Sequence, residues 1–224
     1  MTMQVAMIAA DGILLASDLK WVTLVETPRG PRRKEEYKSK IRSNGEIAIC
    51  CAGEDMDYST KLAETILAHW RDGDGDELQR VREIVKPPLE NKQIECIVAF
   101  APPRKKLIYI VNSMVRNDDE IEWRTFISPV RRVQSAGDPA NDARFWLRYY
   151  DASLSVQELK RLAVHLVVEA QHFNNAMIGG LEVVVSEGSA FRSLSEDECQ
   201  PLEAEAKKLA SQIGELILRP PEGE

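Results

Sequence analysis

A threonine at the second position offers the chemistry from which this chain is best understood. Met1 precedes Thr2, and a small second residue normally permits removal of the initiator methionine. Removal would leave Thr2 with a free α-amino group beside its own hydroxyl. Because an α-amine has a pKa of about 7.7 to 8.0, part of it is neutral at pH 7 and can act as a base. A threonine hydroxyl paired with its own N-terminal amine is a known nucleophile–base arrangement, so Thr2 is the candidate nucleophile.

A carboxylate is expected close to this threonine. Residues 2–9 and 13–18 predict two apolar strands, and the second ends on Asp18. The Asp-Gly pair at residues 11–12 predicts a tight turn, because glycine tolerates the positive φ that short hairpins need. In an antiparallel hairpin the end of the second strand lies beside the start of the first. We therefore expect Asp18 to lie near Thr2.

This opening resembles that of proteasome β-subunits and of their bacterial relative, the HslV-type peptidase. In that pattern a mature N-terminal threonine is followed by an apolar strand, an Asp-Gly turn and a second apolar strand that ends in Ala-Ser/Thr-Asp. Residues 13–18 read Ile-Leu-Leu-Ala-Ser-Asp, and sixteen positions separate Thr2 from Asp18. The resemblance implies a bacterial-type proteasome homologue of the N-terminal nucleophile hydrolase superfamily, with Thr2 and Asp18 in its catalytic group.

The same resemblance implies a catalytic lysine and an oxyanion-stabilising glycine. In the family the lysine immediately precedes an apolar residue, and a strand ending in Ala-Gly follows; Lys40 and Gly53 match these positions. A buried ammonium beside Thr2 would lower the effective pKa of the hydroxyl. Asp18 would pair with that ammonium and hold it in place. The backbone N–H of Gly53 would stabilise the oxyanion.

Lys38 is the alternative to Lys40. Both lie in a strand predicted over residues 37–43, where alternate residues share one side. The pairing of Lys40 with the apolar Ile41, as in the family, favours Lys40.

Three auxiliary positions depart from the family pattern. The usual Gly-Ser-Gly reads Ser-Ala-Gly over residues 135–137, so that Ala136 replaces a serine. The usual Asp-x-x-Ser-Gly-Gly carries Asn175 and Ile178 in place of the aspartate and the serine. In the family these residues hydrogen-bond the terminal amine and hydroxyl, and the side chain of Ile178 cannot do so. The catalytic group is thus present without its usual support.

The rest of the sequence predicts groups of strands and helices in alternation. Further strands are predicted at residues 46–52, 93–101, 106–113, 120–127, 129–135, 179–185 and 191–194, and a loop or two-strand excursion at 21–36. Helices are predicted at 55–72, 76–85, 140–150 and 155–173, with a last one between Ser195 and Pro220. Two sheets enclosed by helix layers would bury the apolar stripes. We expect an α+β fold, the four-layer α-β-β-α sandwich of N-terminal nucleophile hydrolases, as a single proteasome-like domain over residues 1–224.

Composition bounds the function. A length of 224 residues suits one domain with a large core, and a net charge of -7 argues against nucleic acid as a partner. The sequence has neither a signal peptide nor an apolar run of the roughly 18 residues that cross a membrane, so a cytoplasmic location without membrane contact is expected.

Acidic residues at 72, 74, 76 and 83 copy the ligand spacing of a calcium loop, but Glu77 replaces its central glycine. The four cysteines show no zinc spacing. We predict no metal and no cofactor.

Two functions from different classes remain open. The first is a threonine-type endopeptidase whose homo-oligomeric ring, implied by the resemblance, admits peptides or unfolded protein. No nucleotide-binding loop is present in the sequence, so unfolding would need a separate ATPase partner. The second is a noncatalytic structural or assembly subunit, as proteasome α-subunits are. The altered auxiliary positions favour the second, and the intact Thr2, Asp18 and Lys40 favour the first.

Overall fold

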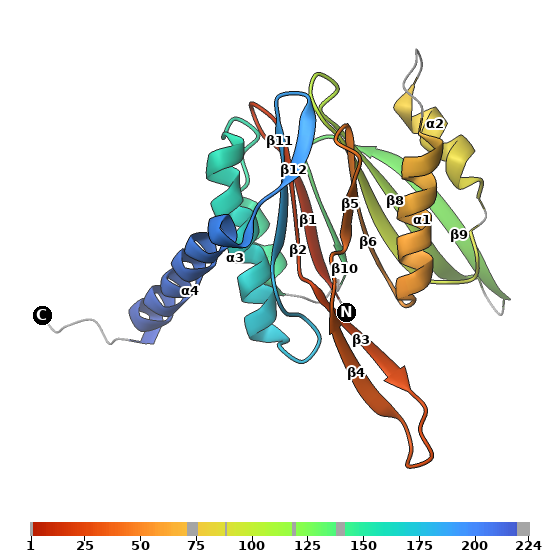
Figure 1. Cartoon of the computed structure of the whole chain (residues 1–224), viewed down its shortest axis with the longest axis horizontal. Coiled ribbons are helices and arrows are strands. Elements are labelled where there is room, and N and C mark those ends of the chain that lie inside the picture. Colours follow the sequence, from red (N-terminus) through yellow and green to blue (C-terminus); the bar gives the residue numbers. More distant parts are fainter. Residues whose placement is uncertain (1, 71–75, 88, 118–119, 138–141, 219–224) are drawn as a thin grey trace, which may run out of the picture.

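The computed structural model describes residues 2–70, 76–87, 89–117, 120–137 and 142–218. Figure 1 shows the order of the elements along the chain. They are β1 (Met3–Ile8), β2 (Ile13–Ser17), β3 (Lys20–Val25), β4 (Arg32–Tyr37), β5 (Ile41–Ser43), β6 (Ile47–Gly53), α1 (Met56–His69), α2 (Glu77–Val85), β7 (Ile94–Phe100), β8 (Lys106–Asn117), β9 (Glu120–Val130), β10 (Val133–Gly137), the 3-10 helix η1 (Asp142–Tyr149), α3 (Val156–Phe173), β11 (Glu182–Glu187), β12 (Ala190–Ser193) and α4 (Glu196–Leu218).

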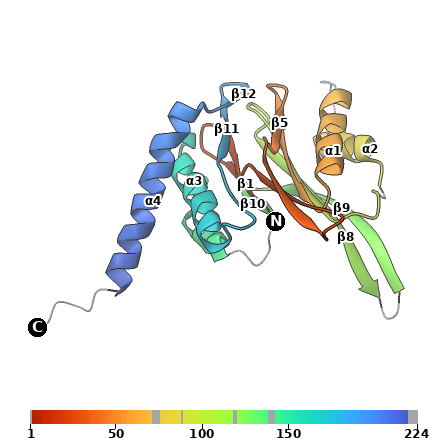
Figure 2. The ribbon, with the colours of Figure 1, turned by 60° about the horizontal axis from the view of Figure 1, so that its bottom comes forward.

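The strands of the described residues form three antiparallel sheets. The first sheet has the order β10-β1-β2-β11-β12, and the second has the order β5-β6-β7-β8-β9. Strands β3 and β4 pair only with each other, as a two-stranded ribbon that projects from the body (Figure 1). Figure 2 shows α3 and α4 beside the first sheet and α1 and α2 beside the second. The predicted α+β class is confirmed, and the finer four-layer arrangement stays a prediction.

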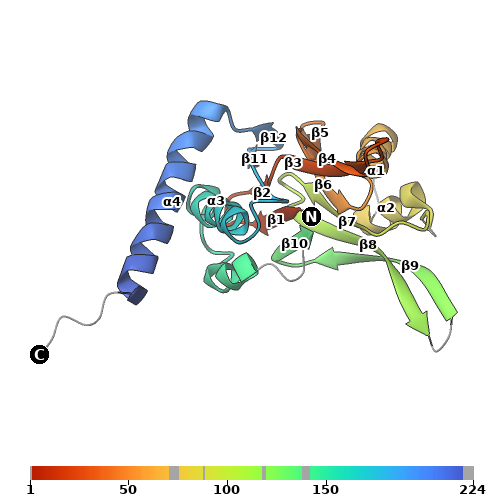
Figure 3. The same ribbon diagram turned by 90° about the horizontal axis from the view of Figure 1, so that it is seen from below.

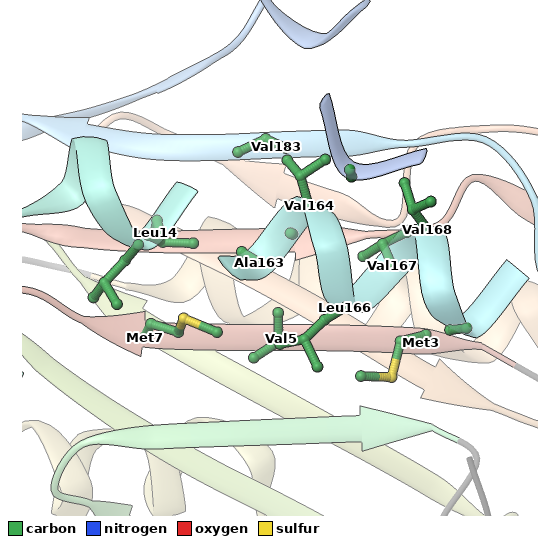
Figure 4. Close-up of a cluster of buried hydrophobic side chains, with 14 of the residues drawn as sticks. Met3, Val5, Met7, Leu14, Ala163, Val164, Leu166, Val167, Val168 and Val183 are labelled. Atoms are coloured by element: carbon green, nitrogen blue, oxygen red, sulfur yellow. The ribbon is translucent and has the colours of Figure 1, made fainter. Parts of the chain in front are cut away.

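In the centre of the first sheet, β1 and β2 are buried on both faces. Alternate residues of each strand point to opposite sides, so each strand contributes to two hydrophobic clusters. The face toward α3 carries Met3, Val5, Met7, Leu14 and Val183, which meet Val164, Leu166 and Val167 of the helix (Figure 4). The face toward the second sheet carries Ala6, Ile13 and Leu15, which belong to one cluster with Ala48, Cys50 and Ile97. The strand that follows the candidate nucleophile therefore starts inside a double layer of packed side chains.

The turn between β1 and β2 lies where the sequence predicts it, but the predicted reason was wrong. Ile8 pairs with Ile13, so four residues make the turn, and Gly12 does not adopt a positive φ. Space requires the glycine instead: a β-carbon at Gly12 would lie 2.5 Å from Ser186 Oγ and 2.9 Å from Val156 Cγ2. The turn is held against α3, because Asp11 Oδ1 accepts the Val156 N–H at 2.7 Å.

Several predicted boundaries were also wrong. Residues 38–40 are not part of a strand; they connect β4 to β5 and include Lys40. The helix predicted at 140–150 is the 3-10 helix η1. Strands β8 and β9 run further than predicted and extend well beyond the helices (Figure 3). Of the two alternatives predicted for residues 21–36, the two-strand excursion is confirmed, as the β3–β4 ribbon, and the loop is not. The calcium-like spacing depends on residues 72 and 74, which lie outside the described residues.

Candidate active site

The register of the β1–β2 hairpin sets the position of Asp18. Gln4 pairs with Ser17, so the next residue along β2 comes to lie opposite Met3. The Met3 N–H donates to Asp18 Oδ1 at 2.9 Å, and the Asp18 N–H donates to the Met3 carbonyl at 3.1 Å. The fully buried carboxylate is therefore attached to the residue that follows Thr2.

The Lys40 ammonium joins this carboxylate to the threonine. Lys40 Nζ lies 2.8 Å from Thr2 Oγ1 and 2.8 Å from Asp18 Oδ2. The side chains of Lys40 and Asp18 are both fully shielded from solvent, and Thr2 is only 5% exposed. The Trp21 ring covers the ammonium, with its centroid 4.9 Å from Nζ. The structure thus brings three of the four predicted site residues into one buried hydrogen-bonded group.

Lys38, the alternative, does not reach this group. Its side chain is exposed and pairs with Glu36. The period-2 argument placed both lysines on one side, and it fails because residues 38–40 are not in a strand. The Lys38 N–H donates to the Leu19 carbonyl at 3.0 Å, which brings the connection close to Asp18.

Burial shapes the proton affinities of the pair. Desolvation lowers the pKa of Lys40, while the nearby Asp18 carboxylate opposes that shift. Desolvation likewise raises the pKa of Asp18, against the Lys40 ammonium and the N–H groups of Met3 and Lys20. The Lys40 ammonium therefore gives up its proton more readily than that of an exposed lysine, and it is held on the oxygen of Thr2.

Gly53 ends β6, next to the start of β1 in space. The Gln4 side chain donates to the Cys51 carbonyl at 3.0 Å, which joins the two strands two residues before Gly53. A β-carbon at Gly53 would lie 2.9 Å from the Gln93 carbonyl oxygen and 2.9 Å from Ser59 Oγ. Close packing alone thus requires glycine here. The residue itself is exposed.

The three altered auxiliary residues provide no polar side chain to Thr2 in the arrangement described. Ala136 lies opposite Gln4 in the β1–β10 ladder and is fully buried. Ile178 is packed in the hydrophobic cluster under α3. Asn175 is exposed, and its carbonyl accepts Lys20 Nζ at 3.2 Å. Two of these positions are parts of the core.

Sequence reasoning missed three residues around the site. Gly137 has φ +102°, and a β-carbon there would overlap the Thr2 carbonyl. Trp21 covers the Lys40 ammonium, and Glu182 accepts the Lys40 N–H at 3.0 Å. The only sequence signal for Glu182 is a carboxylate at the start of an otherwise apolar strand. The resemblance includes Gly137 in the auxiliary motif at residues 135–137 without giving it a role, and nothing local in the sequence connects Trp21 to the site.

A narrow pocket adjoins Lys40. Its lining includes Trp21, Ser39, Arg42, Cys51 and Ser59, and its free volume is about 10 Å³, roughly the space of one water molecule. A larger hollow of about 450 Å³ lies between α1 and α2 and contains none of the predicted site residues. The narrow pocket is therefore the one adjacent to the candidate chemistry.

Across the described ranges, His, Cys, Asp and Glu side chains do not gather in threes as a metal ion would require. None of the helices in that part of the chain combines the length and apolar character needed to cross a membrane.

No protein-family model matches the chain, and no curated protein matches it in sequence. Solved structures do match its fold. "Anbu (ancestral beta-subunit)" from Yersinia bercovieri has a TM-score of 0.66 and 11% identity, over 100% of this chain and 99% of that one. Anbu from Hyphomicrobium sp. strain MC1 has a TM-score of 0.64 and 11% identity, over 100% of both chains. The Anbu complex of Pseudomonas aeruginosa, described as a helical assembly, has a TM-score of 0.62 and 14% identity, over 100% of this chain and 98% of that one.

These comparisons correct the expected relationship. The sequence opening resembles proteasome β-subunits and the HslV-type peptidase, whereas these structural neighbours are Anbu proteins, a distinct proteasome-like family. A short N-terminal motif was the main basis of the expected relationship, whereas the structural likeness extends over 100% of the chain. At 11–14% identity the likeness establishes the fold, so this chain has the proteasome-like fold of the Anbu proteins.

Proposed function

We propose that this chain is a threonine-type N-terminal nucleophile hydrolase that cleaves peptide bonds, with Thr2 as the nucleophile after removal of Met1. One observation carries the proposal: Lys40 Nζ lies 2.8 Å from both Thr2 Oγ1 and Asp18 Oδ2, in a group shielded from solvent. Buried ionisable groups with shifted pKa values beside a nucleophile are typical of catalytic sites.

The chemistry follows from the threonine itself. The neutral α-amine takes the hydroxyl proton while Oγ1 attacks the carbonyl carbon of a peptide bond. The tetrahedral oxyanion collapses, and the departing amine takes the proton from the α-ammonium. An ester then remains on Thr2. Water attacks this ester, the α-amine again accepts a proton, and the release of the acid product restores the hydroxyl.

Lys40, Asp18 and Gly53 would assist this sequence. The Lys40 ammonium hydrogen-bonds Oγ1 and lowers the effective pKa of the hydroxyl. Asp18 keeps Lys40 in place, because it accepts from both the ammonium and the backbone. The Gly53 N–H would stabilise the oxyanion, a role that depends on the sequence resemblance.

We further infer a homo-oligomeric, proteasome-like ring in the cytoplasm, whose chamber limits substrates to peptides and unfolded protein. The assembly of the Pseudomonas aeruginosa neighbour supports oligomerisation. Unfolding of protein substrates would depend on a separate ATPase.

Residues 1–224 would form one domain in four layers, which the packing of α3 on the first sheet and of α1 on the second supports.

The test starts from protein expressed with its native start and no N-terminal tag. We expect its intact mass to lack one methionine. A peptide epoxyketone, which bonds to both the hydroxyl and the free α-amine of an N-terminal threonine, should then add one inhibitor mass to Thr2. Thr2→Ala should take up no label, and neither should wild-type protein that carries an uncleaved N-terminal extension. Protein that has lost Met1 and still takes up no label would contradict the proposal.

A noncatalytic structural or assembly subunit is the second candidate. It is favoured by the burial of Ala136 and Ile178 in the core, where neither side chain can support the amine of Thr2. If the second candidate is correct, the intact mass shows that Met1 is retained, or the epoxyketone does not label Thr2 although the oligomer assembles normally. Covalent labelling of Thr2 would exclude this second candidate.

A further inference from the structure

The main chain that carries Lys40 is held by one carboxylate from a distant strand. Glu182 Oε2 accepts the Lys40 N–H at 3.0 Å and the Ile41 N–H at 3.2 Å. Glu182 Oε1 accepts the Ser39 hydroxyl at 2.6 Å. Three consecutive residues thus donate to a single side chain that is 141 or more positions away in the sequence.

Ser39 and Lys40 lie in a part of the chain that strand pairing does not hold, while Ile41 begins β5 and pairs with Cys50 of β6. Residues 38–40 connect the projecting ribbon to β5, and β5 itself has only three residues. A backbone N–H buried without a partner costs free energy comparable to a lost hydrogen bond. A carboxylate is the strongest acceptor among protein side chains for such groups. Glu182 therefore holds residues 39–40, which lack strand pairing, and fixes them to the start of β5.

Glu182 also connects this segment to the strand that carries Asp18. It begins β11, where it pairs with Ser17 of β2, the residue before Asp18. Two carboxylates of the first sheet thus hold Lys40 at both ends. Asp18 accepts from its ammonium, and Glu182 accepts from its backbone.

We propose that Glu182 is a positioning residue of the site: it fixes residues 39–41 to the first sheet, so that the Lys40 ammonium reaches Thr2 Oγ1 and Asp18 Oδ2 together. The inference rests on the proposed function and adds a residue to it. Glu182 does not contact the reacting atoms in this arrangement, so it acts through Lys40.

The charge of Glu182 has a separate effect from its hydrogen bonds. Two carboxylates act on Lys40, Asp18 from the end of β2 and Glu182 from β11, and both raise the pKa of Lys40 against the effect of burial. A glutamine at position 182 keeps an acceptor for the N–H groups and removes the charge. We therefore expect Glu182→Gln to shift the ionisation of Lys40 to lower pH while its position is kept.

The experiment measures the rate of Thr2 labelling by the epoxyketone across pH in four assembled proteins: wild type, Glu182→Ala, Glu182→Gln and Glu187→Gln. Displacement of a catalytic group by about 1 Å can cost on the order of 100-fold in rate, so Glu182→Ala should be labelled about 10- to 100-fold more slowly. Glu182→Gln should recover most of the rate and move the pH profile to lower pH. Glu187→Gln, which removes an exposed carboxylate of the same strand, should behave as wild type.

A second measurement separates this inference from the proposed function. In crystal structures of Glu182→Ala and Glu182→Gln, the distance from Lys40 Nζ to Asp18 Oδ2 should exceed 3.5 Å, beyond hydrogen-bond range, only in the alanine variant. An unchanged distance in Glu182→Ala, or labelling at the wild-type rate, would overturn the positioning role. If wild type takes up no label, the proposed function fails, and the two crystal structures still decide what Glu182 does. If Glu182→Ala does not fold, Glu182→Asp takes its place, because a side chain one CH₂ shorter draws the carboxylate away from residues 39–41. Labelling of that variant at the wild-type rate, with an unchanged distance from Lys40 Nζ to Asp18 Oδ2, overturns the inference.

Discussion

At the scale of single residues, the site is a small set of buried charges that satisfy one another. Desolvating two ions costs several kcal/mol each, and only close pairing and additional hydrogen bonds offset that cost. Asp18 has such partners, because it accepts from Lys40 Nζ and from the N–H groups of Met3 and Lys20. The geometry at Thr2 is therefore stable only while both charges are present.

Removing one member of the pair should be worse than removing both. In Lys40→Met, Asp18 becomes an uncompensated buried charge, and the free energy of unfolding should fall by about 3 to 5 kcal/mol. The double variant Lys40→Met/Asp18→Leu should recover part of this loss, since no charge is left unpaired. Urea denaturation at one fixed protein concentration measures both effects. A double variant less stable than the single one would contradict the interpretation.

Gly137 should be required for the position of Thr2, beyond its own backbone conformation. Gly137→Ala forces a side chain into the left-handed region and against the Thr2 carbonyl. The control is Gly45→Ala, which has φ +93° but no atom within 4 Å of the added β-carbon. The control should cost only the conformational penalty of about 1 to 2 kcal/mol.

We expect Gly137→Ala to lose more stability than the control and also to lose epoxyketone labelling of Thr2. Equal stability losses, with labelling kept in both variants, would show that Gly137 is needed only for its φ angle.

At the scale of secondary-structure elements, hydrogen bonds at the start of α4 connect this outer helix to β12. Before α4, the Ser195 N–H donates to Glu198 Oε2 at 2.9 Å, and the Glu198 N–H donates to Ser195 Oγ at 3.3 Å. The Arg192 guanidinium binds both oxygens of Glu198, each at 2.9 Å. This arrangement joins β12 to the start of α4.

The Glu198 cap should weaken in acid. The hydrogen bond from Arg192, followed by that from the Ser195 N–H, lowers the pKa of Glu198 to about 2. A depressed pKa in the folded state means that the stabilisation is complete above the ordinary value of about 4.5 and is lost as the pH falls toward 2. The urea midpoint of Glu198→Gln should therefore lie below that of wild type at pH 7, and the difference should shrink as the pH approaches 2. Glu64→Gln, an exposed change on α1, should show no such trend. A difference independent of pH would rule out the charge as the cause.

At the scale of the whole molecule, the proposed peptidase needs an enclosed chamber. Sedimentation of native-start protein should therefore give a particle whose mass is a multiple of 25.2 kDa. Closed rings of identical subunits are a common outcome of head-to-tail interfaces. Thr2→Ala should assemble to the same size, because Thr2 is buried within the subunit. A 25.2 kDa particle at all micromolar concentrations would contradict the chamber and, with it, the restriction to unfolded substrates.

Local patterns in the sequence were enough for part of this fold. Two apolar runs separated by the Asp-Gly pair predict the β1–β2 hairpin, and its register alone brings Asp18 to Met3. The capping box at Ser155 and Glu158 predicts the start of α3 in the same way. These features follow from the sequence, because their partners lie within one turn or one hairpin.

The remainder of the site depended on the tertiary structure. Lys40 was selected by resemblance. Its position in a connection between strands, where Trp21 covers its ammonium and Thr2 accepts from it, results from the packing of two sheets. Glu182 and Gly137 are separated from their partners by more than a hundred positions, and no local periodicity connects such residues. The sequence by itself determined the α+β class, the hairpin and the proximity of Asp18 to Thr2. Only the folded chain decided which lysine joins them and what holds it there, because those contacts form across sheets whose mutual position no short segment encodes.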